Sequence, residues 1–157
     1  PSPQHLTCEM LQKKLGEEKY NRYYKFAFTR NPWSRILSSY YWRQTLPKKR
    51  TSLPFGEFIK LMQHTVENKT YYDDEFGDHF IPQIEYTRGV DDVFRYENLK
   101  SGIITVASKL NIPAPEVPIK EAKAYDNYWE FYNTQTREVI NDVYREEIET
   151  FEYEFGR

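Results

Sequence analysis

The sequence predicts a helix-rich α/β fold in which crossover helices connect the strands of a parallel sheet. Residues 23–29 (YYKFAFT) form an almost unbroken aromatic, β-preferring run with one lysine. Such a run is typical of a strand buried on both faces of a parallel sheet. A helix start follows it at once, and a second strand-to-helix turn lies near residues 93–98. Because parallel strands need long connections, usually helices, two such turns favour this fold.

Size and composition are those of a single domain. The 157 residues are 39% hydrophobic and 17% aromatic, which is enough for a hydrophobic core. A net charge of −2 argues against general nucleic-acid binding, which requires a basic surface. No run of residues reaches the length of a transmembrane helix. We therefore expect no nucleic-acid partner and no membrane segment within these residues.

The first helix is expected over residues 7–15, with Gly16 as its stop signal. After the strand at 23–29, Asn31 and Pro32 mark the next helix start, because asparagine is a favoured N-cap and proline suits the first helical position. Apolar side chains then recur at helical spacing, and we expect this face to pack on the sheet. They are Trp33, Ile36, Leu37, Tyr40 and Tyr41.

Arg30 is placed where an anion would bind. It follows the carboxyl end of the strand, where ligands of open α/β sheets bind, and it precedes the free N–H groups and positive dipole of a helix N-terminus. A phosphate there would meet the guanidinium of Arg30 and could accept a hydrogen bond from the Ser38 hydroxyl. Arg35 could reach the same phosphate or could instead pair with a neighbouring acid.

Further elements follow the same reasoning. Apolar residues from Phe55 to Val66 predict an amphipathic helix, and the polar stretch 67–78 predicts an exposed loop. Residues 93–96 predict a short strand that leads into Asn98, an N-cap, and a helix that ends near Asn111. The inward side chains of that helix are expected to be Leu99, Ile103, Val106, Ala107 and Leu110.

The C-terminal third begins with an extended segment. Residues 112–118 contain three prolines, so they cannot be helical. Residues 125–132 begin a last helical region, and an apolar stripe predicts one long C-terminal helix through Val139 to Phe151.

The segment around Arg30 resembles a known motif. Arg30, Asn31, Pro32, Arg35, Ser38 and Tyr40 give R-N-P-x-x-R-x-x-S-x-Y, which looks like the 3′-phosphate-binding motif of sulfotransferases, in particular the carbohydrate sulfotransferase branch. Other segments resemble that branch in the expected order and cover most of the chain. They are residues 5–7 (HLT), 79–86 (HFIPQIEY), 94–99 (FRYENL) and 144–155 (YREEIETFEYEF).

The resemblance implies a fold and a reaction. The fold would be a P-loop-NTPase-like parallel sheet core with crossover helices. The reaction would move a sulfuryl group from 3′-phosphoadenosine 5′-phosphosulfate (PAPS) to a hydroxyl or amine of an acceptor, often a sugar, with no metal ion required. Carried onto this sequence, Arg30 and Ser38 would bind the 3′-phosphate of the donor.

The sequence departs from the family pattern at the site that binds the 5′-phosphosulfate of the donor. Members of the family bind this group with a glycine-containing loop between the first strand and the first helix, and nothing before Arg30 matches that loop. We expect the sequence to be N-terminally truncated, a single sulfotransferase domain over 1–157 without its first strand and loop. Such a chain would carry half a donor site and is expected to be weak or inactive alone.

Three histidines are candidates for the catalytic base, because histidine removes protons near neutral pH. His5 precedes the first helix and resembles the catalytic histidine of glycan 2-O-sulfotransferases, although it could equally be a flexible terminal residue. His79 lies in the His-x-x-Pro-Gln segment, where a structural role is favoured. His64 ends an apolar helix, where it would complement the helix dipole.

For the remaining polar residues the sequence favours roles other than catalysis or ligand binding. Lys48, Lys49 and Arg50 form a basic run that could dock an acidic glycan but fits a solvated loop better. The acidic residues at 73, 74, 75 and 78 lack the spacing of a calcium loop. Cys8 is the single cysteine, so no disulfide can form within the chain.

Two functions from different classes remain open at this point. One is a PAPS-dependent sulfotransferase; the other is a non-catalytic anion- or glycan-binding module of the same fold. Neither the acceptor nor the compartment follows from the sequence. A bacterial enzyme would be cytoplasmic, and an animal-type enzyme would lie in the Golgi lumen.

Overall fold

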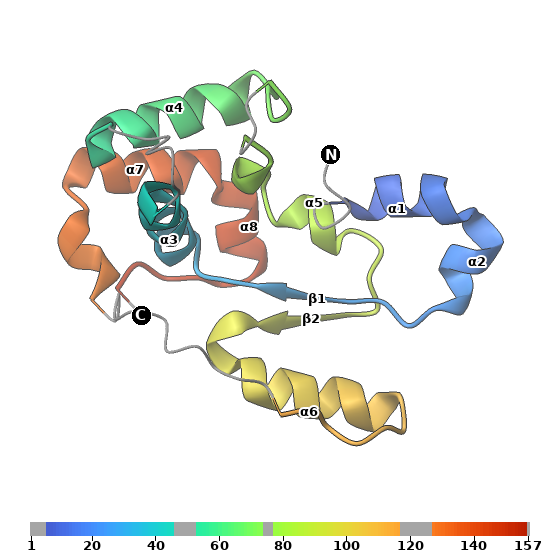
Figure 1. Cartoon of the computed structure of the whole chain (residues 1–157). Coiled ribbons are helices and arrows are strands. Elements are labelled where there is room, and N and C mark those ends of the chain that lie inside the picture. Colours follow the sequence, from blue (N-terminus) through green and yellow to red (C-terminus); the bar gives the residue numbers. More distant parts are fainter. Residues whose placement is uncertain (1–5, 46–52, 74–76, 117–126, 157) are drawn as a thin grey trace. The chain divides into compact units, whose positions relative to one another are not determined.

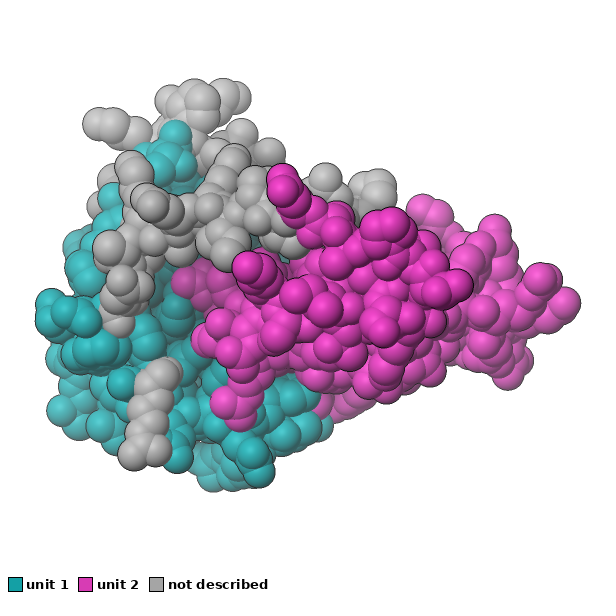
Figure 2. Space-filling model, turned by 90° about the horizontal axis from the view of Figure 1, so that it is seen from below, with its two compact units in different colours: residues 1, 31–82, 125–157 teal, residues 2–30, 83–124 magenta. Residues whose placement is uncertain are grey.

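The computed structural model describes residues 6–45, 53–73, 77–116 and 127–156. Within these ranges the chain is rich in helix and has a small parallel sheet, which confirms a helix-rich α/β fold (Figure 1). The chain forms two compact units (Figure 2). Unit 1 comprises residues 1, 31–82 and 125–157, and unit 2 comprises residues 2–30 and 83–124.

Unit 2 holds the sheet and the helices around it. Its elements are α1 (Cys8–Leu15), α2 (Glu17–Arg22), β1 (Phe26–Thr29), α5 (Ile84–Thr87), β2 (Asp92–Arg95), the 3₁₀ helix η2 (Tyr96–Asn98) and α6 (Leu99–Lys109).

The N-terminal helix of unit 2 agrees with the sequence pattern. The Thr7 hydroxyl accepts a hydrogen bond from the Met10 N–H at 3.4 Å, which makes Thr7 the N-cap of α1. Gly16 ends the helix with φ +80°, a value that residues with a side chain rarely adopt. The predicted helix and its stop signal are therefore confirmed.

The two strands of unit 2 run parallel, as predicted, with Phe26 opposite Asp92 and Thr29 opposite Arg95. Two details of the prediction for β1 are wrong. The strand begins at Phe26 rather than Tyr23, because the backbone N–H of Lys25 instead donates to the Asp91 carboxylate at 2.6 Å. It is also not buried on both faces, since the described part of the sheet has only two strands and Phe26 is 42% exposed.

Helix α6 lies alongside β2 (Figure 1) and approaches both strands closely at Gly102. A Cβ at this position would lie 2.6 Å from Cε1 of Phe28 and 3.1 Å from Cβ of Phe94. Val106 and Ala107 are buried as predicted, but Leu110 is 44% exposed because it follows the last helical residue, Lys109. The missing side chain of Gly102 therefore sets the distance between helix and sheet.

The regular elements that the structure describes in unit 1 are all helices. Its elements are α3 (Pro32–Thr45), α4 (Phe55–Glu67), α7 (Thr134–Val143), α8 (Arg145–Thr150) and the 3₁₀ helices η1 (Gly77–Phe80) and η3 (Tyr128–Phe131). The predicted amphipathic helix at 55–66 is confirmed as α4. The exposed loop is confirmed in part: Tyr72 and Asp73 are exposed, whereas Gly77 and Asp78 are buried.

The apolar face of α3 is buried in a helical core, not on the sheet as expected. Trp33, Ile36 and Leu37 join a cluster that includes Phe58 of α4 and Ile140 of α7. Every described member of this buried cluster belongs to unit 1, and none comes from β1 or β2. A 3.6-residue apolar period shows that a helix face is buried, but it does not say whether the partner is a sheet or other helices.

The predicted long C-terminal helix is divided into two. Tyr144 separates α7 from α8 with φ −111° and ψ +25°, outside the helical region. Its ring is buried and its hydroxyl donates to the carbonyl of Phe80 at 2.8 Å. The apolar stripe continues across this break, which explains why the sequence predicts an unbroken helix.

A largely buried ion pair crosses the interior of unit 1. The Arg35 guanidinium of α3 lies 3.2 Å from the Glu147 carboxylate of α8, and Glu147 is 1% exposed. Burial alone would lower the pKa of Arg35, but the charges and hydrogen bonds of Glu147 and Tyr144 together outweigh burial and raise that pKa. The arginine therefore stays charged, and each ion compensates the desolvation of the other.

The close approach at Gly102 yields a first prediction. Gly102→Ala is expected to destabilise the fold by roughly 1–2 kcal/mol, because a methyl group forced against Phe28 costs more than the improved helix propensity returns. Gly56→Ala in α4 is the matched control, since nothing lies within 4 Å of its added Cβ, and it should slightly raise the melting temperature. Thermal unfolding of both variants checks the prediction, and equal stabilisation by both would contradict it.

The ion pair yields a second prediction. Arg35→Met should lower the free energy of unfolding by roughly 3–5 kcal/mol, because it leaves a buried carboxylate without its cation. Arg35→Met combined with Glu147→Leu should recover most of this loss. Arg145→Met, which removes the exposed pair with Asp142, is the control and should change little. Urea unfolding at 25 °C measures all three, and a harmless Arg35→Met would contradict the assigned role of the pair.

Candidate functional site

Arg30 lies directly after β1 and is held at its backbone and at its side chain. Its N–H donates to Oε1 of Gln83 at 2.7 Å, and Nε2 of Gln83 donates to its carbonyl at 2.9 Å. The Arg30 guanidinium carbon lies 5.1 Å from the centre of the Tyr96 ring. All three residues belong to unit 2.

Asn31 starts α3 as predicted and does more than cap it. Its Oδ1 accepts a hydrogen bond from the Ser34 N–H at 3.2 Å, which satisfies a free N–H of the first helical turn. Its Nδ2 donates to the Tyr128 hydroxyl and to the Glu154 carbonyl, both at 3.0 Å. Asn31 is 2% exposed, so its side chain makes these bonds from a buried position in unit 1.

The other motif residues lie on α3 in unit 1. Ser38 is partly exposed in the middle of the helix. Arg35 pairs with Glu147 and also donates to the carbonyl of His79 at 3.1 Å, and its guanidinium lies 4.8 Å from the centre of the Tyr144 ring. Of the two roles that the sequence left open for Arg35, the structure shows the pairing with an acid.

An aromatic pair in unit 1 was not expected from the sequence. The ring of Trp42 stacks on His79 with 4.9 Å between ring centres and 23° between their planes. Trp42 is 41% exposed. No local sequence signal joins a helix residue to a histidine in a distant 3₁₀ helix, which is why sequence reasoning considered the two residues separately.

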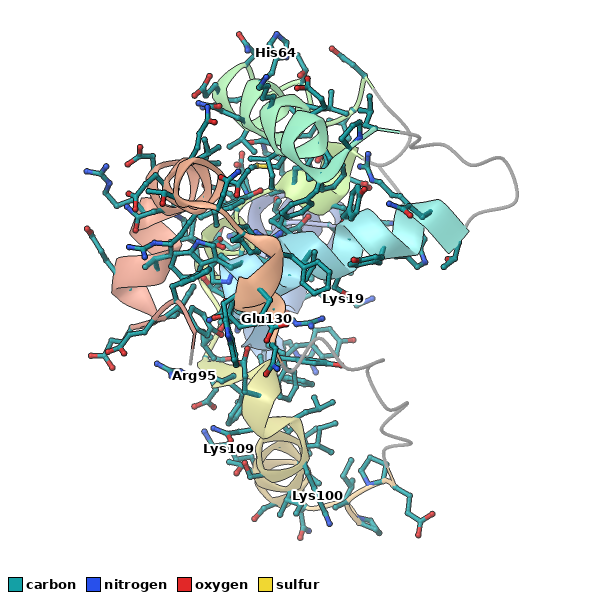
Figure 3. All side chains as sticks on the ribbon, turned by 90° about the vertical axis from the view of Figure 1, so that its left-hand side faces the viewer. Lys19, His64, Arg95, Lys100, Lys109 and Glu130 are labelled. Carbon is teal, nitrogen blue, oxygen red and sulfur yellow. The ribbon has the colours of Figure 1, made fainter. Side chains whose placement is uncertain are left out.

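The three histidines that are candidates for the catalytic base lie in different parts of the chain. His5 lies outside the described residues. His64 is exposed in the last turn of α4, from which it projects outward (Figure 3), and this position fits interaction with the helix dipole. His79 is partly buried in η1.

Other sequence candidates contribute no described site. Lys48, Lys49, Arg50, Asp74 and Glu75 fall outside the described residues. In the part of the chain that the structure describes, no three His, Cys, Asp or Glu side chains gather as a metal site. The Cys8 thiol donates to the carbonyl of Tyr86 at 3.0 Å. Across the same residues, no helix has the length and apolar character needed to cross a membrane.

Unit 2 carries an aromatic cleft of about 440 Å³ beside β1. Its lining includes Tyr20, Tyr23, Tyr24, Phe26 and Tyr86. Burial raises the pKa of Tyr20 to about 12, so its hydroxyl stays protonated at neutral pH and donates to the carbonyl of Gly89 at 3.2 Å. The cleft offers flat aromatic rings, a surface suited to ring-shaped ligands.

Comparison with known proteins identifies relatives. The sequence pattern of the sulfotransferase family matches residues 3–154. An uncharacterised protein of Archaeoglobus fulgidus is 32% identical over 120 residues, which cover 76% of this chain and 93% of that protein. No solved structure matches the chain. Because the family pattern spans nearly the whole chain and includes the segment around Arg30, the protein belongs to the sulfotransferase family.

Proposed function

We propose that the protein transfers a sulfuryl group from PAPS to a hydroxyl or amine of an acceptor, with carbohydrates as the acceptor class. Family membership supports the reaction. The observation that carries the proposal is the placement of Arg30 at the carboxyl end of a parallel strand, immediately before the capped start of α3. The proposed fold is P-loop-NTPase-like, with the described strands as part of its parallel sheet.

In this proposal Arg30 and Ser38 bind the 3′-phosphate of the donor. A guanidinium can donate two parallel hydrogen bonds to a phosphate, and a serine hydroxyl adds a third donor. The assignment rests on the motif that holds both residues. The structure supports the part that concerns Arg30, because its backbone is fixed by Gln83 and its side chain by Tyr96.

The proposed chemistry is an in-line displacement at sulfur. The acceptor oxygen or nitrogen forms a bond to sulfur while the bond from sulfur to the bridging phosphate oxygen breaks, and the electron pair leaves with adenosine 3′,5′-bisphosphate. A base takes the proton of the acceptor, and we propose His5 for this role on the basis of its resemblance to the catalytic histidine of the branch. The protein's main tasks are alignment and stabilisation of charge on the leaving phosphate.

Two aromatic surfaces support a carbohydrate acceptor. One is the tyrosine-lined cleft of unit 2, and the other is the exposed ring of Trp42, backed by His79, in unit 1. Aromatic faces bind the C–H faces of sugar rings, and tyrosine hydroxyls can hydrogen-bond their hydroxyl groups. Neither surface distinguishes one sugar from another.

The role of Arg30 is tested by ligand titration. Arg30→Ala should weaken binding of adenosine 3′,5′-bisphosphate by about ten- to a hundredfold, the loss typical of a bidentate charged contact, and leave adenosine 5′-monophosphate binding unchanged. Isothermal titration calorimetry measures both ligands. The melting temperature should stay nearly constant, because the arginine acts mainly on the ligand.

Arg22→Ala removes an exposed arginine of the same unit and is the matched control, expected to bind like the wild type. Bisphosphate binding by Arg30→Ala at wild-type affinity, or a large loss of stability with binding retained, would count against the proposed phosphate site.

The role of His5 is tested by turnover. His5→Ala should slow transfer of radiolabelled sulfate by about a hundredfold or more, the usual contribution of a general base, without changing bisphosphate affinity. The acceptor is any polysaccharide that the wild type sulfates. His64→Ala is the control and should keep full activity. Normal turnover in His5→Ala would rule out this base.

A further inference from the structure

We propose that Gln83 and Tyr96 are positioning residues for Arg30, the first through the arginine backbone and the second through its guanidinium. This inference rests on the proposed function, since it concerns the affinity of the 3′-phosphate for Arg30. Neither residue belongs to the motif, and neither is itself assigned a contact with the donor.

Gln83 fixes the chain where it leaves the sheet. A primary amide carries one donor group and one acceptor, and Gln83 uses both on the N–H and carbonyl of a single residue, at 2.7 and 2.9 Å. The Gln83 amide thus makes the same two hydrogen bonds to the Arg30 backbone that a residue of a neighbouring strand could make. Two bonds to the same residue restrict its backbone rotation more than one bond would, so the start of the arginine side chain is held in one direction.

Burial makes this pairing hard to exchange for water. Gln83 is 8% exposed and precedes the first residue of α5, a short helix that contacts β1. A buried backbone group that loses its partner keeps its desolvation penalty. Replacement of the amide by an apolar side chain would therefore leave both backbone groups of Arg30 without this partner and loosen the strand end.

Tyr96 acts on the other end of Arg30. Thr29 pairs with Arg95 in the parallel register, so the next residues along the two chains, Arg30 and Tyr96, leave the sheet at the same end. The guanidinium carbon lies 5.1 Å from the ring centre, within range of a cation–π interaction. A ring contact of this kind restricts the guanidinium, which is the group that would make the bidentate contact with the phosphate.

The exposure of Tyr96 argues that its main contribution is not to stability. The residue is 39% exposed, and its ring contact to Arg30 would matter little to folding in a solvated position. A ring that restricts a flexible arginine reduces the side-chain conformational entropy that the arginine loses when it binds the phosphate. The expected signature is a change in affinity that depends on the 3′-phosphate.

The Tyr96 experiment compares adenosine 3′,5′-bisphosphate with adenosine 5′-monophosphate by calorimetry. Tyr96→Leu should weaken bisphosphate binding about threefold and leave the monophosphate unchanged, as expected for loss of an exposed cation–π contact. Tyr96→Phe keeps the ring and should bind like the wild type. Ile104→Ala, which removes an exposed large side chain of unit 2 outside the proposed site, is the control and should have no effect.

The Gln83 experiment uses a double-mutant cycle. Gln83→Met should weaken bisphosphate binding about tenfold, equivalent to about 1.4 kcal/mol, in the wild-type background and have no further effect in Arg30→Ala. Circular dichroism confirms that each variant is folded. If Gln83→Met does not fold, the Tyr96 series together with its own cycle against Arg30→Ala decides the question.

The outcomes distinguish failure of the proposed function from failure of the positioning role alone. Failure of Arg30→Ala to weaken bisphosphate binding, or no bisphosphate binding by the wild type, overturns the proposed function and this inference with it. If Arg30→Ala weakens binding but Tyr96→Leu binds like the wild type, the positioning role of Tyr96 is overturned alone. If Tyr96→Leu or Gln83→Met weakens binding equally in the Arg30→Ala background, the residue acts on the ligand without Arg30 and is not a positioning residue.

Discussion

The side chain of Asn31 makes the hydrogen bonds on which the architecture of unit 1 depends. Its oxygen caps α3, and its amide nitrogen binds the Tyr128 hydroxyl and the Glu154 carbonyl. One buried polar group thus joins the start of a helix to two segments near the C-terminus. Because a buried polar side chain needs partners, the three hydrogen bonds of Asn31 fix the relative positions of those segments within the unit.

The motif residues around Arg30 divide between a proposed contact with the ligand and contacts that stabilise the fold. Asn31 and Arg35 serve the interior of unit 1, the first by capping and the second by compensating the buried charge of Glu147. Arg30 has its described contacts with Gln83 and Tyr96 and is the arginine that the proposed chemistry needs. A short sequence signature can therefore combine residues of different physical roles, and its spacing alone does not assign them.

Local sequence patterns predicted the helices and strands well, but they could not predict contacts between residues that are far apart in the sequence. The Asn31–Pro32 helix start, the Gly16 stop and the parallel pairing of two short strands all follow from backbone chemistry that a few neighbouring residues encode. The break at Tyr144 was missed because the apolar period continues across it. The two hydrogen bonds from Gln83 to the Arg30 backbone and the stacking of Trp42 on His79 were missed because each joins residues from separate segments. Arg30 was placed correctly at a strand end, but the two residues that hold it left no local pattern.

Tyrosine gives the core of unit 1 an unusual character. Tyr132 and Tyr144 donate to the carbonyls of Trp33 and Phe80, and Tyr128 bonds Asn31 and the Gly156 N–H. Burial raises the pKa of Tyr132 and of Tyr144, so both hydroxyls stay protonated and keep donating. Each ring thus contributes apolar surface and a directional bond at a fixed distance from the backbone. An aliphatic core tolerates exchange of one residue for another of similar volume, but here such an exchange would remove a hydrogen bond to a backbone carbonyl. The interior of this unit is consequently expected to diverge more slowly during evolution than its volume alone would require.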